Sequence, residues 1–128
     1  MIDLIYSEFS EDILDISQNE ERDVNKLGFI SKYGKERIAK FLNDNNLQLM
    51  VTSHSWITEG VKAYNKERII IIYSSSNYMD KAGNIAGILN VTKNCNQVVP
   101  KLLDSFKTDK KFYKKSATSQ LSPIRYRK

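Results

Sequence analysis

Apolar side chains recur with a helical period in one part of the chain. Ile38, Phe41 and Leu42 stand at positions i, i+3 and i+4, which places them on one face of a helix. The run Asn-Asp-Asn-Asn at 43–46 ends this pattern, because these side chains compete for backbone hydrogen bonds. The pattern predicts one main helix over residues 34–46.

Most other apolar residues form short runs that are typical of strands. Residues 47–52 and 69–73 are nearly continuous in apolar side chains, which predicts buried strands whose two faces both need cover. Asn65 and Lys66 separate two such runs and predict a hairpin turn. The expected elements besides the helix are a strand at 2–6, a long loop at 7–26 with a helical turn at 12–16, a strand at 47–52, a strand at 56–64 with a break at Gly60, its hairpin partner at 68–73, a loop at 74–84, a strand at 85–91 and a strand or helical turn at 98–106.

These elements predict an α/β fold of α+β character, with mostly one mixed or antiparallel sheet and one main helix. One amphipathic helix cannot cover both faces of the apolar strands. We therefore expect other protein subunits to cover the exposed sheet face, unless loops of this chain fold over it. Trp56 is expected either in the hairpin core or as an interface anchor.

Charged residues are unevenly distributed along the chain. Its 128 residues suffice for one small domain with a core, and its net charge is +5. Residues 1–23 hold eight acids and one base, whereas residues 107–128 hold eight bases and one acid. We expect one domain over 1–106 and a basic, extended tail over 107–128, either simply solvated or bound to an acidic protein surface or cytoskeletal filament. We do not expect nucleic acid as its partner, because no nucleic-acid-binding fold accompanies it. The tail residues expected to make contacts are Lys110, Lys111, Lys114, Lys115, Arg125 and Arg127.

Composition also bears on the compartment. Cys95 is the single cysteine, which allows no internal disulfide and fits a reducing compartment. The N-terminus lacks the pattern of a secretory signal, and no apolar run approaches the ~18 residues of a membrane span. We expect an intracellular protein, cytoplasmic or cytoskeletal, away from the membrane.

The single histidine of the chain lies in a recognisable order of motifs. His54 ends the run Val-Thr-Ser-His at 51–54, where a strand passes into a loop, and the run Tyr-Ser-Ser-Ser-Asn-Tyr follows at 73–78. The pair Glu-Gly at 59–60 lies between them. This order resembles the C-terminal portion of the PPP family of Ser/Thr protein phosphatases, which carry an R-A-H or R-S-H metal histidine, an E-G-Y or D-G-Y hairpin and an F-S-A-P-N-Y loop.

The resemblance extends towards the N-terminus and implies a fold and a chemistry. Residues 3–8 and 28–34 resemble the family's D-L-L-W-S-D-P and R-G-V-S-F-T-F-G segments. It implies the C-terminal half of a metallophosphoesterase β-sandwich, in which two divalent metals of the Mn, Fe or Zn type clamp a phosphate ester and generate a hydroxide. It also implies that His54 ligates one metal and that Tyr78 lines the pocket beside it.

The chain departs from the family where the chemistry is most demanding. The segments G-D-x-H-G, G-D-x-V-D-R-G and G-N-H-E, which supply most metal ligands in the family, do not occur in this sequence. Leu27 stands in place of the phosphate-gripping arginine, Thr52 in place of the arginine before the metal histidine, and Ser76 in place of the loop proline. A catalytic metal needs at least three protein ligands, so one imidazole is not enough. We expect the chain alone to be inactive, without metal at His54.

Three functional hypotheses remain open. The chain is a non-catalytic PPP-like protein that acts as a structural or interaction subunit, or it completes an active site together with a partner chain. Alternatively, it is a piece of a longer active phosphatase whose other motifs are missing from this sequence. Substitutions at Leu27 and Thr52 favour the first hypothesis, whereas the retained His54 and Tyr78 favour the other two.

Overall fold

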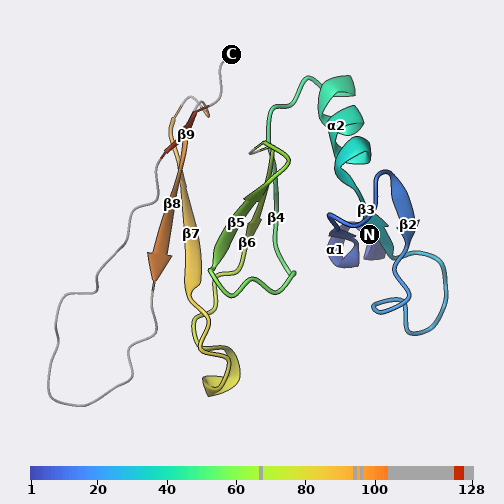
Figure 1. The fold of residues 1–128 in the computed structure, drawn as a ribbon, viewed down its shortest axis with the longest axis horizontal. Helices are drawn as coiled ribbons and strands as arrows, with labels where there is room; N and C mark the ends of the chain where they lie inside the picture. The colour runs from blue at the N-terminus through green and yellow to red at the C-terminus, as the bar shows by residue number, and fades with distance from the viewer. Residues whose placement is uncertain (67, 94, 96, 104–122, 126–128) are drawn as a thin grey trace, which may run out of the picture. The chain divides into compact units, whose positions relative to one another are not determined.

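The chain forms two compact units. The structure is a computed structural model that describes residues 1–66, 68–93, 95, 97–103 and 123–125, apart from the side chain of Leu4. The first unit comprises Met1–Met50 and the second unit Val51–Lys128 (Figure 1).

The first unit begins with a short helix where we expected a strand. Helix α1 spans Ile2–Tyr6. Its last turn is closed by the Ser7 N–H, which donates to the Asp3 carbonyl over 3.0 Å, and the Ser7 hydroxyl donates to the Asp3 carboxylate. A short, mainly apolar segment fits a helix turn as well as a strand, and these local hydrogen bonds favour the turn. The expectation of a strand at 2–6 was wrong.

A three-stranded sheet follows, with the order β1-β3-β2. Strand β1 (Glu8–Phe9) runs parallel to β3 (Ser31–Tyr33), and β2 (Ile16–Gln18) runs antiparallel to β3. We expected residues 7–26 to be a loop with a helical turn at 12–16. Most of this segment is a loop, but it also contains the two short strands β1 and β2, and the expected helical turn was wrong. Strands of two or three residues are too short to show a period in the sequence, and their pairing comes from residues far along the chain.

The predicted main helix is confirmed as α2 (Lys35–Asp44). Its expected apolar face divides, because Ile38 and Leu42 are fully buried while Phe41 is 47% exposed. Gly34 is the N-cap, and a side chain there would meet the backbone of Ile13 and Leu14. The Glu36 N–H donates to the Leu14 carbonyl over 2.9 Å and so satisfies one of the open donors at this helix end.

The second unit opens with a sheet of order β4-β6-β5. Strand β5 (Val61–Tyr64) pairs antiparallel with β6 (Ile69–Ile72), which confirms the predicted hairpin. Asn65 and Lys66 both have positive φ, and the Arg68 N–H donates to the Asn65 carbonyl over 3.2 Å and closes the turn. The apolar run of β6 is buried as predicted, since Ile69, Ile70 and Ile71 are at most 3% exposed.

Two strand predictions need correction in extent. Strand β4 covers only Met50–Thr52 and lies at an edge of its sheet, so Val51 is 47% exposed rather than buried. The strand expected at 56–64 begins only at Val61, because residues 56–60 form a turn that ends at Gly60 with φ +76.

The last sheet has the order β7-β8-β9. A single 3₁₀ turn, η1 (Tyr78–Asp80), lies in the predicted loop before β7 (Ala86–Val91), and β8 (Gln97–Leu103) pairs antiparallel with β7. Residues 98–106, left open between strand and helical turn, thus form a strand as far as the structure describes them.

Part of the segment expected to be a tail joins this sheet. Strand β9 (Ile124–Arg125) pairs antiparallel with the start of β8, and Ile124 is 8% exposed. These two residues are therefore not an extended tail. The other predicted contact residues of the tail, Lys110, Lys111, Lys114, Lys115 and Arg127, lie outside the described residues.

The fold is α+β with one main helix, as predicted. Its strands are distributed over three three-stranded sheets rather than mostly one: α2 separates the first sheet from the second, and the loop with η1 separates the second from the third. Among the residues that the structure describes, no helix is long and apolar enough to cross a membrane.

Candidate functional site

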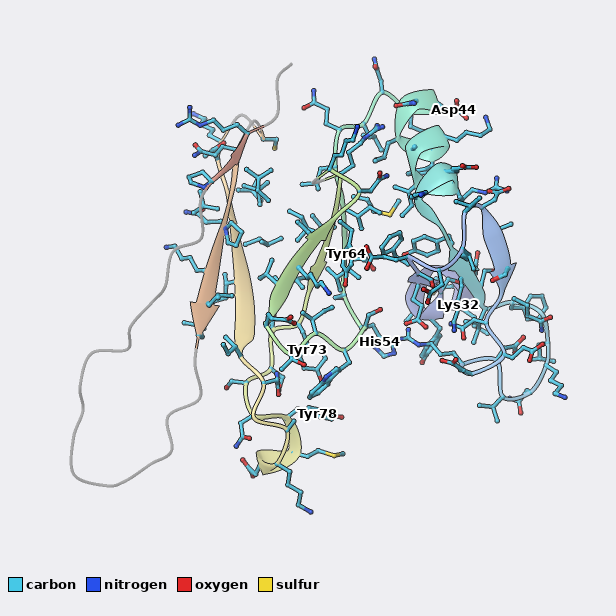
Figure 2. The ribbon with its side chains drawn as sticks, viewed as in Figure 1. Lys32, Asp44, His54, Tyr64, Tyr73 and Tyr78 are labelled. Carbon is cyan, nitrogen blue, oxygen red and sulfur yellow. The ribbon has the colours of Figure 1, made fainter. Side chains whose placement is uncertain are left out.

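His54 lies in the loop after β4, at the end of the second unit where β6 also ends. Its φ of +71° is in the left-handed region, which histidine adopts more readily than most residues. The chain buries Ser55 and Ile57 and exposes His54 and Trp56. Figure 2 shows His54 at the same end of the second unit as Tyr73 and Tyr78. The structure therefore places the two residues that the family resemblance singles out, His54 and Tyr78, at the same end of this unit.

Three aromatic rings gather at this end, and we call Trp56, Tyr73 and Tyr78 the aromatic cluster. The ring centroids of Trp56 and Tyr73 lie 5.2 Å apart, and Tyr78 lies 6.1 Å from each of the other two. Interplanar angles of 59–82° are the tilted and edge-on geometries that aromatic pairs prefer. The three rings are in contact with one another, so they do not enclose a cavity that a ligand could occupy between them.

The aromatic cluster is also partly open to solvent. Trp56 is 48% exposed and Tyr78 is 42% exposed, and Met79 beside them is 74% exposed. Trp56 is thus not a residue of the hairpin core, because it precedes β5 and does not lie within the strand pair. Whether it anchors an interface stays a prediction.

A close approach of two backbones holds Tyr73 in place. A Cβ atom on Gly60 would lie 2.7 Å from the Ala86 carbonyl carbon, and one on Gly87 would meet the Gly60 carbonyl oxygen. Because the backbones lie this close, the Tyr73 N–H donates to the Gly60 carbonyl and the Gly87 N–H donates to the Tyr73 carbonyl, both over 2.8 Å. The two glycines therefore position Tyr73, which lies between β6 and the loop that carries Tyr78.

A buried asparagine holds the loop that carries Tyr78. Asn84 is fully buried, and its side-chain oxygen accepts a hydrogen bond from the Tyr78 N–H over 2.8 Å. Its side-chain nitrogen donates to the carbonyls of Ser75 and Ile85. Asn77 closes the loop from the other side, accepting from the Gly83 N–H over 3.1 Å. The position of Tyr78 thus depends on a network of amide side chains.

The donor set at this end does not fit a two-metal centre on its own. His54 is the chain's one imidazole, and the residues that the structure describes contain no group of three His, Cys, Asp or Glu side chains suited to a metal. A catalytic metal needs at least three protein ligands. His54 can supply one ligand, and any further ligands must come from outside the described residues.

The segment that resembles the family's phosphate-gripping region lies in the first unit. Leu27 is 58% exposed, and its N–H donates to the Asp23 carboxylate over 3.0 Å. The Gly28 N–H donates to the other carboxylate oxygen over 2.6 Å. Burial acts to raise the pKa of Asp23, but the hydrogen bonds from Gly28, Leu27 and the Gln18 side chain outweigh it and lower that pKa below its ordinary value. The loop is therefore well anchored, with an apolar side chain at its tip where the family carries a guanidinium.

Comparisons with known proteins agree with the family resemblance of the motifs. The chain is 34% identical over 71 residues to the serine/threonine-protein phosphatase BSL2 of Arabidopsis thaliana. It is 30% identical over 70 residues to the serine/threonine-protein phosphatase 4 catalytic subunit of Saccharomyces cerevisiae. These matches cover 56% and 55% of this chain, and its fold superposes on a yeast protein serine/threonine phosphatase with similarity to human PP5 with a TM-score of 0.62. The chain resembles a portion of a PPP-family phosphatase.

The resemblance is to part of a phosphatase. The matched residues amount to 7% of the Arabidopsis phosphatase and 22% of the yeast catalytic subunit. The structural match covers 77% of this chain but 32% of the yeast phosphatase, at 18% sequence identity, and so concerns the fold alone. No protein-family model matches the chain.

Sequence reasoning missed the residues that hold the site together. Tyr73 was expected at the end of a strand and Asn84 at the end of the following loop. In the structure Tyr73 packs against the other two rings of the aromatic cluster and Asn84 holds Tyr78. The available signal was an asparagine directly before an apolar strand, because a buried amide there commonly satisfies the backbone of a preceding loop.

Proposed function

We propose that this chain is a non-catalytic PPP phosphatase-like protein that acts as a structural or interaction subunit of a larger assembly. The observation that carries the proposal is the small number of possible metal ligands. His54 is the chain's one imidazole, and the described residues contain no group of three His, Cys, Asp or Glu side chains suited to a metal. Leu27 and Thr52, at positions where the resemblance implies arginines, support it. Both arginines would contact or orient a phosphate through a planar fork, which neither leucine nor threonine provides.

Exposed apolar side chains support a role in protein association. Val51 on the sheet edge is 47% exposed, Trp56 in the His54 loop is 48% exposed, and Met79, next to Tyr78 in the chain, is 74% exposed. An edge strand with apolar side chains favours pairing with another chain. We propose that a partner protein covers β4 and the aromatic cluster, and that the assembly lies inside the cell.

Two measurements on the purified chain test the absence of catalysis. A phosphoserine or phosphothreonine peptide is incubated with the chain and Mn²⁺, and Mn²⁺ binding is followed by titration calorimetry. His54→Ala is the matched control. We expect no turnover above that of His54→Ala and no specific Mn²⁺ binding. Turnover by the wild-type chain that His54→Ala abolishes would contradict the proposal.

A second function has one observation in its favour. His54, Tyr73 and Tyr78 gather at one end of the second unit, and a hydrogen-bonded loop holds Tyr78 there. This arrangement suits one wall of a phosphatase site whose metal ligands lie on another chain or in sequence beyond these residues. In that case the substrates would be phosphoserine or phosphothreonine in proteins, and His54 would ligate one of two divalent metals.

Complementation separates the two functions. The chain is mixed with a polypeptide that carries the G-D-x-H-G, G-D-x-V-D-R-G and G-N-H-E segments of a PPP phosphatase. Turnover that appears only in the mixture and is lost in His54→Ala would establish the second function. A stable complex without turnover is the outcome expected for an interaction subunit.

A further inference from the structure

Positive and negative charges are separated along the second unit. Its described residues carry seven Lys or Arg side chains and two Asp or Glu side chains. Both acids lie near the aromatic cluster, Glu59 just before β5 and Asp80 in η1. Four of the bases lie in or beside the turns at the other end of the strands.

The topology brings these four bases to one end, which we call the turn end. Lys66 and Arg68 lie in the β5–β6 turn, and Lys93 lies in the turn between β7 and β8. Arg125 in β9 pairs with Gln97, the first residue of β8 after that turn. Figure 1 shows both turns and β9 at the end of the second unit opposite η1.

Backbone contacts support this placement. The Gly87 N–H donates to the Tyr73 carbonyl over 2.8 Å, so β7 begins where β6 ends. The Ile85 N–H donates to the Thr58 carbonyl over 2.9 Å, so β7 and β5 begin side by side. Because β5 and β7 both leave the site end, the turns that follow them lie at the opposite end.

The exposed bases of the turn end are not neutralised as those of the first unit are. Four ion pairs between described residues lie in the first unit. Lys66, Lys93 and Arg125 are exposed and take part in none of these ion pairs. Glu67 adds one negative charge to the β5–β6 turn by sequence, so the four bases leave a net charge of +3 at this end. The ion pairs of the first unit are Arg22–Glu8, Lys32–Glu21, Arg37–Asp15 and Lys40–Asp44.

We infer that the turn end binds an acidic segment of a partner protein. Exposed cations without a carboxylate partner attract carboxylates by charge complementarity, which accelerates and orients association. Single-stranded nucleic acid suits this surface less well, because its bases need exposed aromatic rings for stacking. Tyr64 is half-buried, and Lys62 already lies 5.1 Å from the centroid of its ring. Duplex nucleic acid binds through phosphate contacts whose number sets the affinity, so four bases favour it only weakly.

The binding surface is separate from the aromatic cluster, so the inference does not depend on the proposed function. It requires only that the turn end binds an acidic segment of another protein. The test therefore uses the full chain and probes of defined chemistry, a fluorescein-labelled twelve-residue glutamate-rich peptide, a neutral glutamine-rich peptide of equal length and a single-stranded oligonucleotide of equal charge. Fluorescence anisotropy at two salt concentrations measures each affinity.

Two charge-reversal variants with the same net charge locate the binding. Lys93→Glu/Arg125→Glu alters the turn end, and Lys26→Glu/Lys81→Glu alters one exposed residue of the first unit and one exposed residue directly after η1. We expect roughly a tenfold loss of affinity for the glutamate-rich peptide in the first variant, as for a few exposed charge pairs, and a much smaller loss in the second. We also expect affinity to fall as salt rises. Lys93→Gln/Arg125→Gln, a milder change, repeats the measurement if the first variant does not fold.

Three outcomes would overturn the inference. Equal losses in the turn-end and control variants would show that the peptide responds only to net charge. Unchanged affinity in the turn-end variants would place the binding elsewhere, for example on the lysines of 107–122. Tighter binding of the oligonucleotide than of the peptide would identify nucleic acid as the partner.

Discussion

Gly60 is the residue whose replacement tests the architecture of the candidate site most directly. Its φ of +76° is in the left-handed region, and a Cβ atom there would lie 2.7 Å from the Ala86 carbonyl carbon and 2.8 Å from the Gly87 nitrogen. Gly60→Ala therefore combines two perturbations, backbone strain and a backbone clash. Both neighbouring atoms are main chain, so the clash can be relieved only if β5 and β7 separate.

Two other glycines separate these contributions. Gly83 has φ +63° and no atom within 4 Å of a built Cβ, so Gly83→Ala adds strain alone, about 1–2 kcal/mol. Gly87 is not in the left-handed region, but its Cβ would meet the Gly60 carbonyl and the Val61 side chain, so Gly87→Ala adds crowding alone. Overpacking of this kind costs about 1–3 kcal/mol. Gly60→Ala should then lower the free energy of unfolding by about 2–5 kcal/mol, the sum of both effects.

Urea unfolding followed by tryptophan fluorescence measures all three variants. Trp56 is the chain's one tryptophan, and its ring lies 5.2 Å from that of Tyr73, which the Gly60 carbonyl helps to hold. We expect Gly60→Ala to be the most destabilised of the three variants. We also expect its native-state fluorescence to differ from that of the wild type. If Gly60→Ala unfolds within about 0.5 kcal/mol of Gly83→Ala, the resolution of such comparisons, then β5 and β7 do not approach closely at Gly60 and the account of the site is wrong.

Two further predictions concern the hydrogen bonds of buried side chains. Asn84→Ala should lower the free energy of unfolding by about 1–3 kcal/mol, because it leaves the Tyr78 N–H and the Ser75 carbonyl without their partner. Hydrogen exchange of the Tyr78 amide should accelerate in this variant, and unchanged exchange would argue against a positioning role for Asn84. The lowered pKa of Asp23 means that its carboxylate stabilises the fold above the unfolded-state pKa of about 3.9, and that this contribution is lost as the pH falls through the lower folded-state pKa. Melting temperatures measured from pH 6 to about pH 2 should therefore converge for wild type and Asp23→Asn at the acidic end, and a constant difference across this range would contradict the assignment.

Local patterns in the sequence were sufficient where an element depends on its own residues. The apolar face of α2 and the isoleucine run of β6 are explicit in the sequence, and the turn at Asn65 and Lys66 follows from the polar pair between two apolar runs. The order of the motifs around His54 also indicated the phosphatase resemblance, because the spacing of short motifs along a chain does not require knowledge of their contacts.

Elements that depend on distant partners were mispredicted. The sequence Ile2–Tyr6 fits a strand or a helical turn equally, and hydrogen bonds from Ser7 to Asp3 decide for the helix. Strand β9 has two residues within a lysine-rich segment, and only pairing with β8 makes it a strand. Burial of β4 was likewise overestimated, because an apolar run does not reveal that its strand lies at a sheet edge.

The amino-acid sequence by itself determined which chemical groups are present, namely one imidazole, the tyrosines of the loop and the separated charges. Tertiary structure alone decided which of them meet. Trp56, Tyr73 and Tyr78 come from three separate segments, and they touch because two glycines let the backbones of β5 and β7 approach and a buried asparagine holds the intervening loop. The same strand directions place the β5–β6 turn with Lys66, the β7–β8 turn with Lys93, and Arg125 in β9 at the opposite end. Contacts of this kind arise from close packing and hydrogen-bond satisfaction over long chain separations, which local patterns of apolar and polar residues do not encode.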